Sequence, residues 1–251
     1  MKVKGIERYR EVLEERWSCF NAEAFIEADP LNVVYRLVRG ERACVDVRDI
    51  EVGALFVAMI AWGNRIMIKN NALKLMELTN WHPYNYIVQG KYEEFPDGQC
   101  VHRTLFGKEF KEVCRRLRGV YEEYGSLEEY LVEEGEVGDS SRYVERLAKI
   151  TAPARLGSVS GKSACKRLCM YMRWMVRRER PDLGLWRRID QSKLFAVLDV
   201  HVVRQAKEQG LVTGTTASWR AVEELTSCYR EWCNEDPLKY DMVMMMEDVE
   251  R

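Results

Sequence analysis

Apolar residues recur every three to four positions along most of the chain, whereas the strict alternation typical of a half-buried strand is scarce. The clearest case is the long apolar run that follows Asp49 and ends at Gly63. This pattern predicts an all-α protein. The predicted helical segments are residues 6–28, 31–39, 49–62, 66–78, 105–124, 127–132, 143–150, about 163–177, 199–209, 217–233 and a last segment from 236.

The helix predicted from about Ser163 has two distinct faces. Its buried stripe is made of Ala164, Leu168, Met172 and Met175, and the opposite face carries Lys166, Met170, Arg173 and Arg177. The Ser163 hydroxyl is expected to cap this helix and to place Lys166 in the first turn. There the positive end of the helix dipole disfavours an ammonium ion, which would help this lysine to lose its proton.

Asp199 is predicted to be the N-cap of the next helix. It follows the apolar run Phe195–Leu198 and precedes Val200, Val202 and Val203 at helical spacing. An N-cap aspartate on its own is usually only a cap, so a catalytic function for Asp199 needs further support.

That support comes from a resemblance. The run Leu198–Arg204, which reads LDVHVVR, resembles the V-D-T-H-V-x-R element of the helix-hairpin-helix DNA glycosylases, the endonuclease III superfamily. In that superfamily a lysine that opens a helix precedes the aspartate, and Lys166 resembles it. The interval of 33 residues between Lys166 and Asp199 is most similar to that of the archaeal 8-oxoguanine DNA glycosylase branch. The motifs RWMVRR, DLGLW, LDVHV and DPLKYD also resemble the bacterial DUF2400 family, from Asp29 to Asp241.

The superfamily resemblance implies a fold and a set of site residues. The fold would be one compact helical unit over residues 1–251 with two lobes, a central lobe at about 45–165 and a second lobe from 1–44 plus 166–251, with DNA between them. Lys166 would be the nucleophilic amine, and Asp199 would stabilise the positively charged sugar. The base pocket would contain Asp241, Met245 and Met170. The DNA contacts would come from Gly161, Lys162, Ser163, Arg167, Arg173, Arg177, Asn64 and Arg204.

Two of these assignments have a simpler alternative. Asn64 follows Gly63, and Gly-Asn is a common helix breaker, so a plain turn residue is the favoured interpretation over a side chain that enters DNA. Asp241 could equally be another N-cap.

Charge is distributed unevenly. The net charge is −1, but residues 162–204 contain eleven Lys and Arg against four Asp and Glu, a local balance of +7. This stretch suits a localised contact with a polyanion. A solvated helix face remains the alternative, because Lys and Arg are good surface residues of helices.

Several classes of protein are excluded by simple patterns. The apolar runs are shorter than the roughly eighteen residues that a membrane helix needs, and no signal peptide opens the chain, so a cytoplasmic location is expected, nucleoid-associated if the protein repairs DNA. The eight cysteines form no C-x-x-C, which predicts reduced thiols and no metal site. The run 157–163 resembles a P-loop but has three residues between its glycines where that motif has four. No metal or nucleotide cofactor is expected.

The function predicted from these residues is that of a DNA glycosylase with AP lyase activity. Its partner would be double-stranded DNA with a damaged base, an oxidised purine such as 8-oxoguanine, attacked through a lysine Schiff base. Two alternatives stay open. One is a non-catalytic DNA- or RNA-binding protein on the same scaffold, and the other is a helical protein-interaction module.

Overall fold

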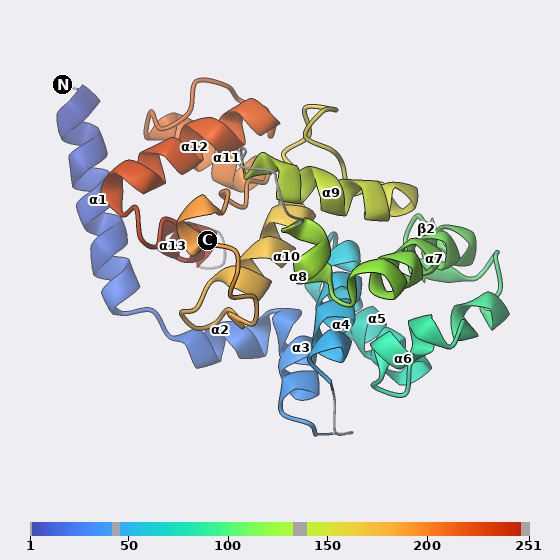
Figure 1. The fold of residues 1–251 in the computed structure, drawn as a ribbon. Helices are drawn as coiled ribbons and strands as arrows, with labels where there is room; N and C mark the ends of the chain where they lie inside the picture. Colours follow the sequence, from blue (N-terminus) through green and yellow to red (C-terminus); the bar gives the residue numbers. More distant parts are fainter. Residues whose placement is uncertain (1, 42–45, 133–139, 247–251) are drawn as a thin grey trace. The chain divides into compact units, whose positions relative to one another are not determined.

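The computed structural model describes residues 2–41, 46–132 and 140–246, with side chains described over 5–41, 46–132 and 140–244 (Figure 1). The chain divides into two compact units. The first unit comprises the described residues of Met1–Ala22, Asp139–Glu145 and Gly157–Arg251, and the second comprises those of Glu23–Gly138 and Arg146–Leu156. Each unit is built from segments that are distant in the sequence.

The second unit is mainly helical and contains one small sheet. Two short antiparallel strands pair Cys100 with Phe106 and His102 with Leu105, so the expectation of a purely α-helical chain is corrected to a mostly helical one. The elements are α2 (Ala22–Ala28), α3 (Leu31–Val38), α4 (Val47–Ile60), α5 (Arg65–Leu78), α6 (Pro83–Val88), η1 (Lys91–Glu94), β1 (Cys100–His102), β2 (Leu105–Phe106), α7 (Gly107–Tyr124), α8 (Leu127–Leu131) and η2 (Ala152–Ala154).

Helix α4 is the centre of the second unit, and every residue from Asp49 to Ile60 is buried. It begins at Val47, two residues before the predicted start. Asp46 is the N-cap, and the Asp49 side chain accepts a hydrogen bond from the Asp46 N–H, which completes a capping box. Helix α3 packs against α4. The described residues of 23–44 therefore belong with the central helices, whereas the sequence placed them with the chain ends.

The first unit gathers both ends of the chain. Helix α1 packs along α13, where Lys239 Nζ lies 2.9 Å from Glu14 Oε2. Helix α9 contributes residues to both units. The helices of the first unit are α1 (Lys2–Ser18), the start of α9 (Ser141–Thr151), α10 (Lys166–Val176), η3 (Gln191–Lys193), α11 (Val200–Glu208), α12 (Trp219–Trp232) and α13 (Lys239–Met246).

Aromatic side chains fill the core of the first unit. Trp174, Trp186 and Trp219 are buried, and Tyr171 meets Trp186 edge to face at 5.5 Å between ring centroids. The buried stripe of α10 packs into this core, which fixes the orientation of the helix that begins with Lys166. Over the described residues no helix is both long and apolar enough to cross a membrane.

Candidate active site

Lys166 is the first residue of α10, but the helix does not begin as the sequence predicted. The N-cap is Cys165, whose backbone is left-handed (φ 47°) and whose side chain makes no capping hydrogen bond. Ser163 instead pairs with Ser218 in an isolated β-bridge, and its Oγ accepts a hydrogen bond from the Cys165 N–H at 3.2 Å. The expected Ser163 N-cap is therefore wrong. The turn at Cys165 still places Lys166 at the positive end of the helix dipole.

Asp199 is the N-cap of α11, as predicted. Its Oδ1 accepts hydrogen bonds from the backbone N–H groups of His201 and Val202, both at 2.9 Å. The buried segment that leads to it is fixed by two side chains from other helices. Thr226 Oγ1 accepts from the Ala196 N–H at 3.0 Å, and Asp241 Oδ2 accepts from the Val197 N–H at 2.7 Å.

The two residues predicted to be catalytic are in direct contact. Lys166 Nζ lies 2.7 Å from Asp199 Oδ2, although the two are 33 positions apart in the sequence. The side chains are 34% and 25% exposed, so a ligand can reach them from solvent. Burial raises the pKa of Asp199, but the charge and hydrogen bond of Lys166 and the two backbone N–H groups outweigh it, so the pKa lies below its usual value. Asp199 is therefore ionised at neutral pH.

This arrangement can support nucleophilic chemistry. A lysine attacks carbon only as a neutral amine, so its proton must first pass to another group. The adjacent carboxylate can then stabilise positive charge that develops on the atom under attack. Because Asp199 Oδ1 is held by the start of α11, the carboxylate has a fixed orientation toward Lys166.

The turn before Lys166 does not offer the backbone N–H groups expected for a phosphate. The N–H groups of Val159 and Ser160 donate to Glu145 Oε2 at 2.7 and 3.3 Å. Those of Gly161, Lys162 and Ser163 donate within the turn, to Ser158 Oγ, Val159 O and Ser158 O. All five donors are engaged, so the predicted phosphate site formed by the backbone of Gly161, Lys162 and Ser163 is corrected. The Lys162 side chain is exposed and could still contact a polyanion.

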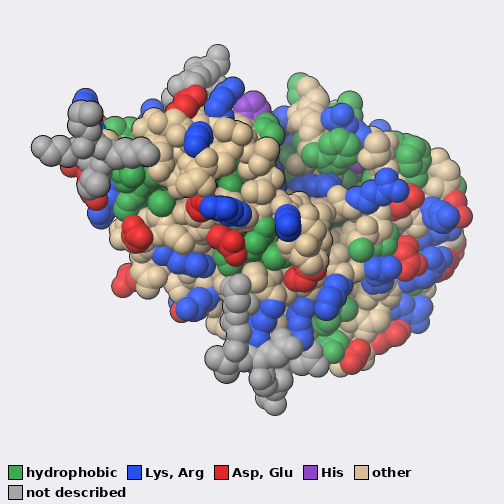
Figure 2. All heavy atoms as spheres, turned by 90° about the horizontal axis from the view of Figure 1, so that it is seen from above, with side chains coloured by type: hydrophobic (Ala, Val, Ile, Leu, Met, Phe, Trp, Pro, Cys, Tyr) green, Lys and Arg blue, Asp and Glu red, His purple; other side chains and the backbone are tan. Residues whose placement is uncertain are grey.

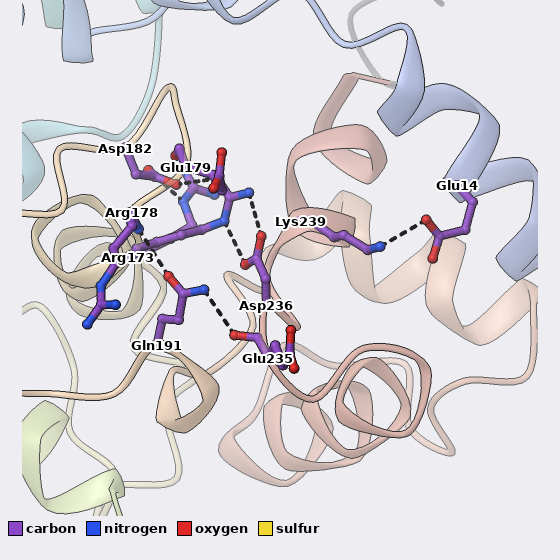
Figure 3. Close-up of polar contacts among 10 residues, drawn as sticks. Glu14, Arg173, Arg178, Glu179, Asp182, Gln191, Glu235, Asp236 and Lys239 are labelled. Atoms are coloured by element: carbon purple, nitrogen blue, oxygen red, sulfur yellow. Dashed lines mark hydrogen bonds and ion pairs between the residues drawn. The ribbon is translucent and has the colours of Figure 1, made fainter.

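Arg173 and Arg177 are buried, not exposed on an outer face of α10. The Nε of Arg173 lies 3.2 Å from Asp182 Oδ1, and Nη1 of Arg177 lies 3.1 Å from Asp182 Oδ2. The Asp236 carboxylate accepts two hydrogen bonds from Arg177, from Nε to Oδ1 and from Nη2 to Oδ2, both at 2.8 Å (Figure 3). The predicted DNA contact at these two arginines is wrong, because their guanidinium groups lie in a buried ion-pair cluster.

The other predicted DNA contacts lie in different settings. Arg167 is half-buried, and burial lowers its pKa to about 10, which still leaves it charged at neutral pH. Arg204 is exposed on α11. Asn64, in the second unit, caps α5, because its Oδ1 accepts from the Met67 N–H at 3.1 Å. This agrees with the turn interpretation of Asn64.

The predicted base-pocket residues are in the core. Asp241 is 1% exposed and Met170 is 6% exposed, so a base could reach them only through a local opening. Asp241 lies in the first turn of α13. Its Oδ2 accepts a hydrogen bond from the Val197 N–H, and its Oδ1 has no hydrogen-bond partner. The Met245 side chain lies outside the described residues.

Sequence reasoning did not single out Thr226 or Glu145, and it assigned Asp241 to the base pocket and not to the support of the site. Thr226 and Asp241 fix the approach to Asp199, and Glu145 holds the turn before Lys166. Nothing in the local sequence marks these partners, since each acts on a segment that is between 14 and 44 positions away. In the described part of the chain, no group of three or more His, Cys, Asp and Glu side chains could hold a metal ion.

Comparison with known proteins places the chain in a family. Neither a curated protein nor a solved structure matches the chain. One family model, described as "Protein of unknown function (DUF2400)", matches residues 29–250, which include both Lys166 and Asp199. The chain belongs to the DUF2400 family.

Proposed function

We propose that the protein is a lysine-dependent DNA glycosylase with AP lyase activity. The observation that carries the proposal is the ion pair of Lys166 and Asp199 at 2.7 Å, partly open to solvent and placed where two helices begin. The similarity of Leu198–Arg204 to the V-D-T-H-V-x-R element of the helix-hairpin-helix glycosylases gives the pair its chemical interpretation.

The chemistry assigned to the pair begins with Lys166. Its neutral amine bonds to C1′ of an extruded nucleotide while the glycosidic bond breaks, and the base leaves with the bonding electrons and takes up a proton. Asp199 stabilises the positive charge on the sugar in this step. Ring opening gives an imine between Lys166 and C1′. Loss of a proton from C2′ then expels the 3′ phosphate and cuts the strand.

An oxidised purine such as 8-oxoguanine is the proposed substrate. This choice rests on similarity to the archaeal 8-oxoguanine branch and on Asp241, which has one unpartnered carboxyl oxygen that could accept a hydrogen bond from a purine. Since Asp241 is buried, base binding requires a local opening around α13.

Borohydride trapping tests the proposal directly, because reduction of the imine joins protein and DNA permanently. We expect trapping on a duplex that carries 8-oxoguanine or an abasic site. Lys166→Ala should abolish it and Asp199→Asn should slow it strongly. Lys207→Ala is the matched control, since Lys207 is an exposed lysine of the same unit outside the pair, and it should trap like the parent protein.

Other outcomes would favour the alternatives. If no duplex is trapped and no base is released, but the protein binds DNA in a salt-dependent way, it is a non-catalytic nucleic-acid-binding protein. If it binds neither damaged nor undamaged DNA, the protein-interaction module is the better interpretation.

A further inference from the structure

An exposed basic segment follows α10. Residues 178–193, here called the basic loop, join the end of α10 to the buried run that leads to Asp199. Its exposed charged side chains are five basic ones against Glu179 and Asp190. The basic side chains are Arg178, Arg180, Arg187, Arg188 and Lys193.

The backbone of the basic loop is fixed to α10. The N–H groups of Leu183 and Gly184 donate to Trp174 O at 2.8 and 3.2 Å, and the Trp186 N–H donates to Met175 O at 2.8 Å. These bonds satisfy carbonyl groups at the end of α10 that have no partner within the helix. The loop is therefore bonded to the helix over its middle part.

Side chains fix the loop a second time. Gln191 accepts from the Arg178 N–H at 3.1 Å and donates to Glu235 O at 3.0 Å, as Figure 3 shows. Asp182, a residue of the loop, is the shared carboxylate of the buried ion-pair cluster with Arg173 and Arg177. A loop held at these points loses little conformational entropy when it binds a partner.

Three of the five basic side chains of the loop keep uncompensated charge. In Figure 3 the Arg178 guanidinium points away from the buried cluster. Within the described residues, no ion pair joins Arg178, Arg187 or Lys193 to a carboxylate. Asp190 lies nearby, and its pKa is lowered first by the Ser192 backbone and then, less strongly, by Lys193 and Arg178. The two exposed acidic side chains of the loop, Glu179 and Asp190, do not balance its five exposed basic ones.

The chemistry of the loop selects the kind of partner. Of its large apolar side chains, Trp186 and Ile189 are buried, and Leu183 and Leu185 are half-buried, so none is exposed. A protein interface usually needs exposed apolar anchors, and a membrane surface needs an apolar face to insert. Exposed Arg and Lys without such groups are typical of contacts with the phosphates of a nucleic acid.

The position of the loop on α10 relates it to Lys166. Figure 2 shows one face of the molecule, where Lys and Arg side chains are dispersed among acidic and uncharged ones. The loop lies at the end of α10 opposite Lys166. That helix has 11 residues, so its ends are about 16 Å apart. This length spans about five phosphates of one DNA strand.

We propose that the basic loop is a phosphate-contacting surface for duplex DNA. This inference rests on the proposed function only in placing the reacting nucleotide at Lys166. The contact is independent of base sequence and of damage. It fixes the register of the duplex, about five base pairs from the extruded nucleotide.

The test is the salt dependence of binding to an undamaged duplex, which involves no chemistry. Binding weakens as salt rises, and each phosphate contact that is removed reduces the magnitude of the slope of log Kobs against log salt by about 1. The triple variant Arg178→Gln, Arg187→Gln, Lys193→Gln should reduce this magnitude by about 3 and weaken binding equally on damaged and undamaged DNA. The double variant Arg178→Lys, Arg187→Lys keeps all three charges and should keep the slope.

The matched control removes exposed charge elsewhere. Lys74→Gln with Lys108→Gln changes two exposed lysines of the second unit and should leave the slope within experimental error. Unchanged melting temperatures would show that each variant is folded. An unchanged slope in the folded triple variant would overturn the proposal, even if Lys166 traps DNA. A slope of smaller magnitude without any trapping would uphold it and refute the glycosylase function.

Discussion

Asp199 combines two functions that substitution can separate. Its Oδ1 caps α11, and its Oδ2 pairs with Lys166. Asparagine is as good an N-cap as aspartate but carries no charge. Alanine can neither cap the helix nor pair with Lys166. The pair therefore has a structural and a chemical part that can be measured independently.

We predict that Asp199→Asn keeps the stability of the fold and loses reactivity. Asp199→Ala should lower the free energy of unfolding by about 1 kcal/mol more than Asp199→Asn, because two backbone N–H groups at the start of α11 lose their acceptor. Urea unfolding gives the stability and borohydride trapping gives the reactivity. Equal stability of the two variants would show that the cap contributes nothing.

Asp241 should make stability depend on pH in an unusual direction. Burial raises its pKa to about 7, against the opposing effects of Arg173 and of the Val197 N–H. Between about pH 4 and pH 7 the folded protein keeps a proton that the unfolded chain releases, so stability falls as pH rises through this range. The loss has an upper limit on the order of 4 kcal/mol.

The measurement that isolates this effect is urea unfolding of the parent protein and of Asp241→Asn at several pH values from 4.5 to 8. Asparagine can still accept the hydrogen bond from the Val197 N–H but does not titrate. We expect the parent protein to lose stability relative to the variant as pH rises to about 7, and the difference to stay constant above that. Parallel pH profiles would mean that Asp241 stays ionised in the fold.

At the scale of elements, the buried ion-pair cluster connects α10, the basic loop and the segment before α13. Asp182 is 3% exposed and pairs with two buried guanidinium groups at once, and Asp236 supplies the second negative charge through Arg177. A buried charge that loses its partner is costly, whereas an exposed ion pair contributes little. The cluster therefore holds these segments together only while Asp182 is charged.

We predict that Asp182→Asn lowers the free energy of unfolding by about 3 to 5 kcal/mol. Glu112→Gln is the control, because it removes a carboxylate from exposed pairs with Arg115 and Arg116 on α7 and should change stability by less than about 0.5 kcal/mol. Denaturant unfolding of the three proteins measures both effects. A loss from Asp182→Asn no larger than that of the control would mean that the arginines find other partners or water.

The elements show what the sequence could predict. Helical spacing alone predicted α4, α7, α11 and α12, because each buries one stripe or a whole apolar run. The Asp199 cap was also predictable, since capping uses N–H groups two and three residues away. Short-range physics therefore accounts for most of the helices and for one half of the site.

The errors come from long-range partners. Arg173 was expected on an outer face of α10, but its partner Asp182 lies nine residues further along the chain, on a loop. Asp236, the second partner of Arg177, is 59 residues away. Ser163 looked like a helix cap, yet its backbone pairs with Ser218. Periodicity cannot reveal such partners, because the same pattern of Arg and Ser also suits a solvated surface.

At the scale of the whole molecule, the chain passes repeatedly between its two units. The first unit consists of three sequence segments and the second of two, and α9 contributes to both. Domains that fold independently usually come from continuous segments with few crossings between them. The segments of each unit are joined to one another through the other unit. Unfolding of either unit would therefore leave these connections unconstrained.

We therefore predict that the two units unfold together, and buried thiols can report on each. Cys114 belongs to the second unit and Cys169 to the first, and burial raises the pKa of both thiols well above the usual range. Since the thiolate is the reactive form, both should resist alkylation in the folded protein, while the exposed Cys19 and Cys100 react quickly. With increasing urea, peptide mass spectrometry should show Cys114 and Cys169 becoming labelled at the same midpoint. Two separate midpoints would show instead that each unit is stable without the other, and that the crossings of the chain impose no cooperativity on the fold.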